Sequence, residues 1–420
     1  KSLEQCDERC KQGEKGTESK CMYPKSCRLL LSPVAIRKNM TWVSNQLLTW
    51  IGWILGLLDY GFLLFKLLGP FQPKFYRKGY GDIHKILELQ IQTLKQSSDG
   101  SDGFQLITDD QLIWGGVKPT WGNVTIQEGR FRSPLAQELP PEAAFTQFFL
   151  VKPKKDPAIV EGKAETEKDV YIIMLPATGE TDISLRLLIA KQLANRYGWS
   201  SLLVTAPYYG DRKPKDQALF FVNTVEDTFT QAWSIIQETT ALTKYLLAKS
   251  PNSLVCLTGF SFGAAMAANS ANVALQSGVD GQRLACASYV GSSSPCVLAD
   301  GLLESAIDWN ALRKSNEESQ TITQQRLVAK FYETQMTSLT PETLQNPIRV
   351  VHGYNMTHDA FIQNKYAIEF EQHIQICLNP SFQMKWLPGG HVFAAVTRPI
   401  LHKKLIEEVV LELIHSHSRD

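Results

Sequence analysis

Apolar and polar residues follow two different patterns along the chain, and the change comes near Val124. From there to the C-terminus, short apolar runs are separated by stretches with helical periodicity, such as Ser184–Tyr197 and Thr228–Ala248. The later runs lack alternation, which is typical of strands covered on both faces. We expect strands at Val124–Phe131, Phe145–Val151, Val170–Leu175, Ser200–Thr205, Leu254–Thr258, Leu284–Val290, Ile348–His352 and Gln383–Leu387.

This alternation of strands and helices predicts the fold class. Successive strands joined by helices make right-handed crossovers, which give a mostly parallel central sheet with helices on both faces. The first two strands have no helix between them, so we expect them to form an antiparallel edge. The pattern therefore predicts an α/β domain over residues 70–420 with no internal repeat.

The N-terminal part of the chain differs from this domain. Residues 1–46 are rich in Lys, Glu, Gly and Ser, and we expect a disordered extension. Residues 47–69 are the most apolar stretch and are long enough to span a membrane, but Asp59 would cost about 3 kcal/mol inside a bilayer. A membrane span, an interfacial helix and a helix that caps the core of the α/β domain all remain open. Gly52 and Gly56 have the spacing of a close helix contact.

Composition adds limits on partners. Lys and Arg (43) balance Asp and Glu (42), so no strong field favours nucleic acid. Cys256 and Cys286 lie in apolar runs and are expected to be buried small residues. The other cysteines include a group with no zinc-ligand spacing in the N-terminal extension, which we interpret as incidental thiols of the tail: Cys6, Cys10, Cys21 and Cys27. The chain begins at Lys1 rather than Met, so we expect the true N-terminus to lie upstream.

The strongest chemical signal is the sequence Gly-Phe-Ser-Phe-Gly from Gly259 to Gly263. It follows the apolar run LVCLT and precedes a helix of small residues. A nucleophile on a sharp strand-to-helix turn requires small residues two positions before and after it, because larger side chains would clash there. This context predicts that Ser261 is a nucleophile.

A serine of this kind requires a base, and the chain has eight histidines. In this arrangement the base comes last along the chain. His391 follows an expected strand and a Gly-Gly pair, so a loop can bring its ring over Ser261. His352 and His358 are the alternatives. The others precede the sheet or are expected on helices at solvated positions: His84, His373, His402, His415 and His417.

The acid is expected in the loop after the strand that precedes the base. Asp359 is the only carboxylate in that loop. Asp300 and Asp308 are alternatives, because some hydrolases take the acid from the loop after the preceding strand. The sequence therefore predicts a triad of Ser261, Asp359 and His391.

Two backbone amides must also bind the oxyanion. One is expected at Phe262, directly after the nucleophile. The other is expected in the loop that follows the strand YIIML, at Ala177 or Thr178, because Pro176 has no N–H. Phe260 and Phe262 flank the nucleophile and are expected to line an apolar acyl groove.

Several segments around these residues resemble the family of α/β-hydrolase domain-containing protein 18. The resemblance covers roughly Leu57 to the C-terminus, whereas residues 1–56 have no counterpart and the region from Trp309 to Pro347 is shorter than in some members. The segments that carry it are LPATGE (175–180), APYYGDRKPKDQ (206–217), GFSFGAAMA (259–267), HDAFI (358–362) and PGGH (388–391).

The resemblance implies an α/β-hydrolase fold and a membrane-associated lipid acyl hydrolase, without a metal or cofactor, with a link to mitochondrial phospholipids such as cardiolipin. It also implies that Tyr208 and Tyr209 face the substrate and that Arg212, Lys213 and Lys215 lie near the mouth of the site.

Three functions stay open at this point. The first is hydrolysis of a lipid carboxylic ester, and the second is transfer of the acyl chain to an alcohol by a protein of the same fold. The third is a non-catalytic binding or scaffold protein that keeps the pocket without turnover. The expected partners are a lipid substrate and a membrane surface. The oligomeric state has no sequence signal.

Overall fold

The computed structural model describes residues 50, 52–61, 73–98, 106–119, 123–154, 168–314, 318–337 and 346–417. The described elements belong to one unit, Leu48–Asp420. The expectations for residues 1–46, their four cysteines included, lie outside the described residues, as does much of the apolar segment 47–69.

The described strands form one sheet in the order β1-β2-β3-β5-β4-β6-β7-β8-β9. The pairings from β5 through β4, β6, β7 and β8 to β9 are parallel, whereas β1, β2 and β3 pair antiparallel and β3 also meets β5 antiparallel. The strands are β1 (Ile113–Pro119), β2 (Val124–Arg132), β3 (Phe145–Pro153), β4 (Val170–Leu175), β5 (Ser200–Val204), β6 (Leu254–Phe260), β7 (Leu284–Tyr289), β8 (Val350–Met356) and β9 (Met384–Leu387).

This topology confirms the predicted mostly parallel sheet with an antiparallel edge, and it is the strand arrangement of an α/β hydrolase. Two strands differ from the sequence prediction. β1 was not expected, because Gly115 and Gly116 interrupt its pattern and its register shifts between Trp114 and Val117. β8 continues to Met356 instead of ending at His352, which shortens the loop that carries the expected acid.

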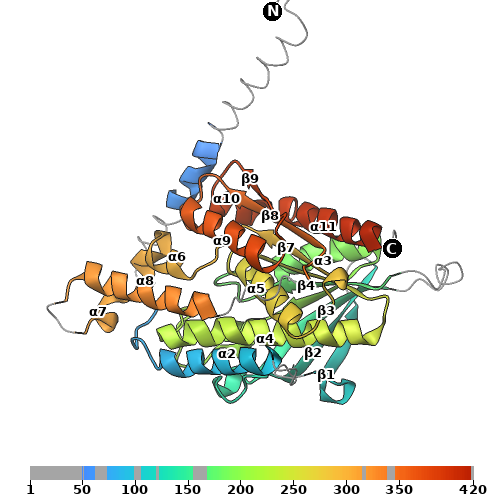
Figure 1. Cartoon of the computed structure of the whole chain (residues 1–420), viewed down its shortest axis with the longest axis horizontal. Helices are drawn as coiled ribbons and strands as arrows, with labels where there is room; N and C mark the ends of the chain where they lie inside the picture. Colours follow the sequence, from blue (N-terminus) through green and yellow to red (C-terminus); the bar gives the residue numbers. More distant parts are fainter. Residues whose placement is uncertain are drawn as a thin grey trace, which may run out of the picture. The chain divides into compact units, whose positions relative to one another are not determined.

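Helices cover both faces of the sheet (Figure 1). α3 and α11 pack on one face, and α5 packs on the other with α4 and then α2 outside it. The described helices are α2 (Ile83–Ser98), α3 (Ser184–Tyr197), α4 (Val225–Lys249), α5 (Phe262–Gln276), α6 (Cys296–Ala299), α7 (Trp309–Leu312), α8 (Gln320–Thr337), α9 (Asn364–Cys377), α10 (His391–Thr397) and α11 (Leu401–His417), with a further helix over residues 52–61.

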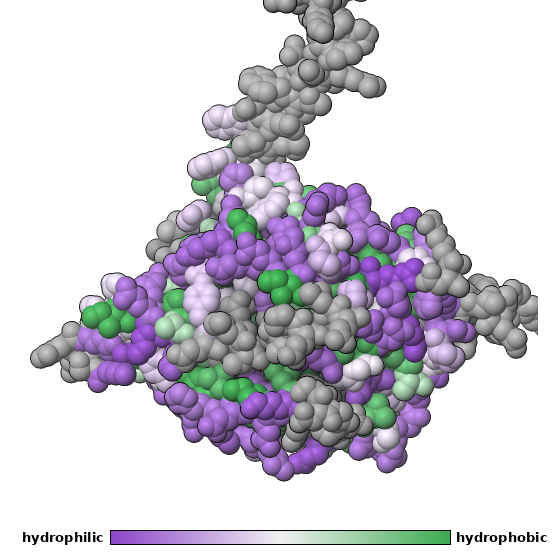
Figure 2. Space-filling model, in the orientation of Figure 1, coloured by the Kyte–Doolittle hydropathy of each residue, from purple (hydrophilic) through white to green (hydrophobic). Residues whose placement is uncertain are grey.

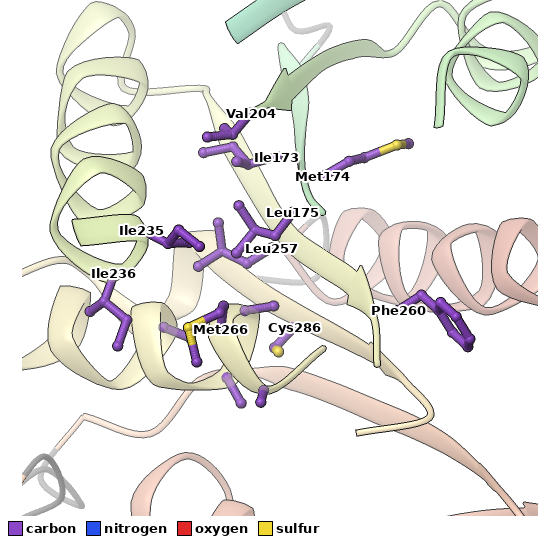
Figure 3. Packing of buried hydrophobic residues seen from close by; sticks show 14 of the residues in the cluster. Ile173, Met174, Leu175, Val204, Ile235, Ile236, Leu257, Phe260, Met266 and Cys286 are labelled. Carbon is purple, nitrogen blue, oxygen red and sulfur yellow. The ribbon is translucent and has the colours of Figure 1, made fainter. Parts of the chain in front are cut away.

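The core lies between the central strands and these helices. Figure 3 shows Leu175 and Leu257 of the sheet near Ile235 of α4 and Met266 of α5. Every residue of β6 is buried, which explains why its sequence shows no alternation. The face of the molecule in Figure 2 is mainly hydrophilic, with separate hydrophobic patches.

The parallel strands place their following loops at one edge of the sheet, where ligands bind in open α/β folds. Ser261 follows β6, the loop 176–180 follows β4, Asp359 follows β8 and His391 follows β9. Residues that are far apart in the sequence therefore meet at the carboxyl edge of the sheet.

Candidate active site

Ser261 occupies a sharp turn between β6 and α5. Its backbone lies in a sparsely populated region, with φ 56° and ψ −120°. A Cβ at Gly259 would lie 2.2 Å from the carbonyl carbon of Gly263, and a Cβ at Gly263 would lie 2.6 Å from the oxygen of Leu175. The two glycines are therefore required by close packing, and the turn directs the serine away from the sheet.

Asp359 and His391 lie together. The carboxylate oxygen Oδ2 of Asp359 is 2.8 Å from Nδ1 of His391. The other oxygen accepts hydrogen bonds from the amides of Phe361 (2.8 Å) and Ile362 (2.7 Å), which fix the carboxylate. The Asp359 side chain is fully buried, whereas that of His391 is 13% exposed and lines the same cavity as Ser261.

The expected oxyanion donors lie at the start of α5 and in the loop after β4. Phe262 is the first residue of α5, so its amide has no carbonyl partner within the helix. The amide of Ala177 donates to Glu180 at 3.2 Å. Ala177 and Thr178 both line the cavity. Because the Ala177 amide is already engaged, Thr178 is the better candidate for the second donor.

Glu180 joins this loop to two buried arginines. Its carboxylate pairs with Arg186 and, at 3.0 Å, with Arg398. Burial alone would raise the pKa of Glu180, but the two guanidinium groups hold it below its ordinary value. Arg398 also lies 5.0 Å from the ring of Phe260. This network fixes the loop of the expected oxyanion donors against the end of α10.

A cavity of about 600 Å³ contains Ser261 and His391 on its wall. It is lined mainly by apolar side chains, and none of its lining residues within the described ranges is Asp, Glu, Lys or Arg. Phe260 and Phe262 belong to the lining, as expected. Larger apolar side chains extend it toward α4 and the rim: Phe229, Trp233, Ile236, Met266, Leu298 and Val396.

With this geometry established, comparison with known proteins gives the family. A model of the family described as "Alpha/beta hydrolase domain containing 18" matches residues 73–351. The chain belongs to this family. The matched range includes Ser261 but ends before Asp359 and His391. The assignment of the acid and the base therefore rests on the geometry of the structure.

The chain is also similar to several solved structures, at low sequence identity. A cold-adapted esterase from an Arctic intertidal metagenomic library is 12% identical, over 71% of this chain and 99% of the esterase, with a TM-score of 0.42. An S-formylglutathione hydrolase from Agrobacterium tumefaciens is 11% identical, over 70% of this chain and 99% of its own, with a TM-score of 0.41. The fluorophosphonate-binding serine hydrolase F of Staphylococcus aureus is 12% identical, over 70% and 99%, with a TM-score of 0.39.

The alternative acids have other partners in this family member. Asp300 pairs with Lys365 and accepts a hydrogen bond from the Tyr366 hydroxyl at 2.9 Å. Burial raises the pKa of Asp300, but these two contacts outweigh burial and lower it. Asp308 accepts the amide of Ala311 at the start of α7. Neither carboxylate is bonded to His391.

The alternative bases are also engaged elsewhere. Nε2 of His352 is 3.0 Å from the Glu412 carboxylate. Nδ1 of His358 is 2.8 Å from the Thr357 hydroxyl. Of these candidates, His391 is the one that lines the cavity with the serine.

One histidine differs clearly from the solvated position that we expected, and a second is half-buried. His402 is 1% exposed, and its Nε2 lies 2.8 Å from the Thr258 hydroxyl. Burial lowers the pKa of His402 well below its ordinary value and lowers that of His373 to about 4. The ring of His402 also stacks on that of Tyr289, with 5.2 Å between the ring centroids, so this side chain belongs to the packing of α11 on the sheet.

The proposed role of Arg212 at the mouth of the site is wrong. Its side chain is 2% exposed and pairs with Glu238 of α4 at 2.6 Å. It also donates to the carbonyls of Thr205 (2.7 Å) and Ala143 (2.9 Å). A buried arginine must find such partners, so its charge is used inside the fold.

Tyr208, Tyr209 and Lys213 do not meet the cavity either. The two tyrosines are 4% and 3% exposed, and neither lines it. Burial raises the pKa of Tyr209 to about 12. The Lys213 ammonium donates to the carbonyls of Pro214 and Gln217. The described contacts of these three side chains therefore lie within the fold, where we expected substrate contacts.

The buried cysteines behave as expected. Cys256 and Cys286 are buried, as are Cys296 and Cys377. Within the described ranges, no three His, Cys, Asp or Glu side chains gather in a way that could hold a metal ion.

Sequence reasoning gave no role to Glu180, and it treated Asp59 only as a cost inside a membrane. Glu180 lies in a segment of family resemblance, which was a signal for it. Asp59 is fully buried and bonds to the loops of the acid and the base. The feature of the sequence that could have pointed to a role for Asp59 is that it is a single carboxylate in an otherwise apolar segment.

Proposed function

We propose that the protein is a serine hydrolase that cleaves the acyl ester of a membrane phospholipid. The observation that carries this proposal is the uncharged, mainly apolar cavity that contains Ser261 and His391. Its volume of about 600 Å³ lies within the roughly 300–1,000 Å³ of ligand pockets. An apolar cavity of this size suits a fatty acyl chain better than a peptide or a charged metabolite.

The residues at this site have distinct roles in the proposed reaction. Ser261 attacks the ester carbonyl and gives its proton to Nε2 of His391, while Asp359 stabilises the imidazolium at Nδ1. The amides of Phe262 and Thr178 donate to the oxyanion. The C–O bond then breaks, and His391 returns the proton to the leaving alcohol. Water then attacks the acyl-serine, with His391 again accepting the proton, and the fatty acid is released as His391 returns that proton to Ser261.

The outer face of the helix over residues 52–61 supports a membrane location. Large apolar side chains on it are exposed, including Trp53 (62%), Ile54 (63%) and Leu57 (59%). Val396, at the cavity wall on α10, is 73% exposed. None of the described helices is long and apolar enough to cross a bilayer. We infer that this helix lies in the membrane interface and that lipid enters the cavity from there.

The lipid class follows from the family resemblance, and cardiolipin is the first phospholipid to test. The experiment uses vesicles of cardiolipin, phosphatidylglycerol or phosphatidylcholine and measures fatty acid release by the full-length protein. We expect release from at least one of them and none with Ser261→Ala. Wild-type activity on water-soluble esters alone would contradict the lipid proposal.

A cavity variant tests the acyl site directly. Ala232→Trp on α4 places a large side chain in the cavity wall, whereas Ala248→Trp changes an exposed position of the same helix. We expect Ala232→Trp to lower turnover of long-chain esters at least tenfold, which is about 1.4 kcal/mol, and to spare an acetyl ester. The control should change neither. Equal loss on both esters would show that the cavity does not hold the acyl chain.

A further inference from the structure

The helix over residues 52–61 exposes its apolar side chains and buries a charged one, which is the reverse of the usual arrangement. An amphipathic helix buries its apolar stripe, but here the buried residues are Gly52, Gly56 and Asp59. Their spacing of four and three residues puts them on one face. The apolar side chains of Trp53 and Leu57 point outward. The inner face of this helix is therefore built around one carboxylate.

That carboxylate contacts both loops of the acid–base pair. Oδ2 of Asp59 accepts the amides of Ala360 (3.1 Å) and His391 (2.9 Å), and Oδ1 accepts the amide of Val392 (2.7 Å). Ala360 directly follows Asp359. One side chain from the N-terminal segment thus binds the backbone next to the acid and the backbone of the base itself.

The contact needs close approach, and the sequence permits it. A Cβ at Gly390 would lie 2.6 Å from Oδ2 of Asp59. A Cβ on Gly52 would lie 3.0 Å from the ring of His358, and the Cβ of His358 would lie 2.9 Å from one on Gly56. Larger residues at these three positions would move the helix away from the two loops.

A structural role alone explains this arrangement poorly. Burial raises the pKa of Asp59, opposed by the three amide hydrogen bonds. Within the described residues, no lysine or arginine pairs with it, so its charge is balanced by backbone amides of the catalytic loops. Apolar residues would dock this helix at lower cost.

We propose that Asp59 is a positioning residue for the Asp359–His391 pair. It fixes the separation of the two backbones, on which the 2.8 Å bond between Asp359 and His391 depends. The two loops also meet through the His358 amide and the Gly389 carbonyl at 2.9 Å. Asp59 adds a third element that joins them. This inference rests on the proposed function, because it assigns the pair to catalysis.

The test compares Asp59→Ala and Asp59→Asn with Asp110→Ala in the full-length protein. The readout is the rate at which a fluorophosphonate probe labels Ser261, together with kcat and KM for a soluble ester. A displacement of about 1 Å costs about 100-fold in rate, so we expect Asp59→Ala to lower labelling and kcat by about that factor with KM unchanged. Asp59→Asn keeps an acceptor oxygen and should retain an intermediate rate. Asp110→Ala removes an exposed carboxylate before β1, outside the cavity, and should match wild type.

A spectroscopic readout separates positioning from activity. The proton shared by Asp359 and His391 gives a downfield resonance in the proton NMR spectrum, and we expect it to weaken in Asp59→Ala at an unchanged thermal midpoint. Wild-type labelling with an intact resonance in Asp59→Ala would overturn the inference. If Asp59→Ala does not fold, wild-type labelling and resonance in Asp59→Asn would overturn it. Failure of wild-type protein to react with the probe would instead overturn the proposed function, and the resonance would still report positioning.

Discussion

Two sets of loops at the carboxyl edge of the sheet are both polar and both carry family resemblance, but they use their polar atoms differently. In the loop 206–217, the Arg212 guanidinium is bonded to Glu238 and to two backbone carbonyls. In the loops after β8 and β9, Asp359 binds His391, and the ring of His391 still reaches the cavity. A polar residue near an active site can react only if the fold has left one of its polar atoms available.

The largest effect expected from this comparison is at the acid. Asp359→Asn should lower turnover by about 10⁴-fold, because the histidine loses the charge that fixes its tautomer and stabilises its protonated form. The measurement is turnover of a soluble ester at a matched concentration of folded protein. Asp300→Asn is the control, since that carboxylate pairs with Lys365. A larger loss of turnover in Asp300→Asn would show that the catalytic acid is Asp300, after β7, and not Asp359.

A stability effect should appear at the buried pair instead. Arg212→Met leaves the Glu238 carboxylate buried without its partner, and we expect a loss of about 3–5 kcal/mol in the free energy of unfolding. Denaturant titration measures it. The double variant Arg212→Met/Glu238→Leu should recover much of that loss. Probe labelling per folded molecule should stay at the wild-type level. A loss of labelling without a loss of folded protein would show that Arg212 contributes to the active site.

The smallest effect is expected at the exposed lysine of the same loop. Lys215 is exposed, and the cavity lining contains no cation within the described residues. Lys215→Glu should therefore change the ratio of cardiolipin to phosphatidylcholine hydrolysis by less than twofold, which is about 0.4 kcal/mol. Vesicle assays at fixed ionic strength measure the ratio. A collapse of the ratio would show that this loop meets the head group.

The sequence predicts the central fold because its signals there are local. The apolar runs of β4 and β6 are unbroken, and the glycines at 259 and 263 mark the turn at Ser261. Asp359 and His391 could be chosen because loop order limits the candidates. β1 was missed because its two glycines and exposed positions resemble a loop.

The remaining features depend on partners that lie far away in the sequence. The residues next to Arg212 in the sequence do not indicate that it forms an ion pair with Glu238, on a buried face of α4. From the sequence, Asp59 is only an energetic cost in an apolar segment. Its partners are backbone amides more than 300 positions away, and the sequence does not show which backbone amides a carboxylate will meet. Pattern reasoning identifies what a residue can do, whereas packing decides whether its polar atoms are available.

The contact between Asp59 and His391 also affects the order in which the protein matures. The two residues are 332 positions apart, and the helix of Asp59 is synthesised first. At ribosomal speeds of about 5–20 residues per second, roughly 15–65 s pass before its docking loops exist. During that time the helix has apolar side chains and no folded partner. The acid–base pair can therefore form only after His391, 332 positions later, has been made, so the nascent enzyme stays inactive at least until that point.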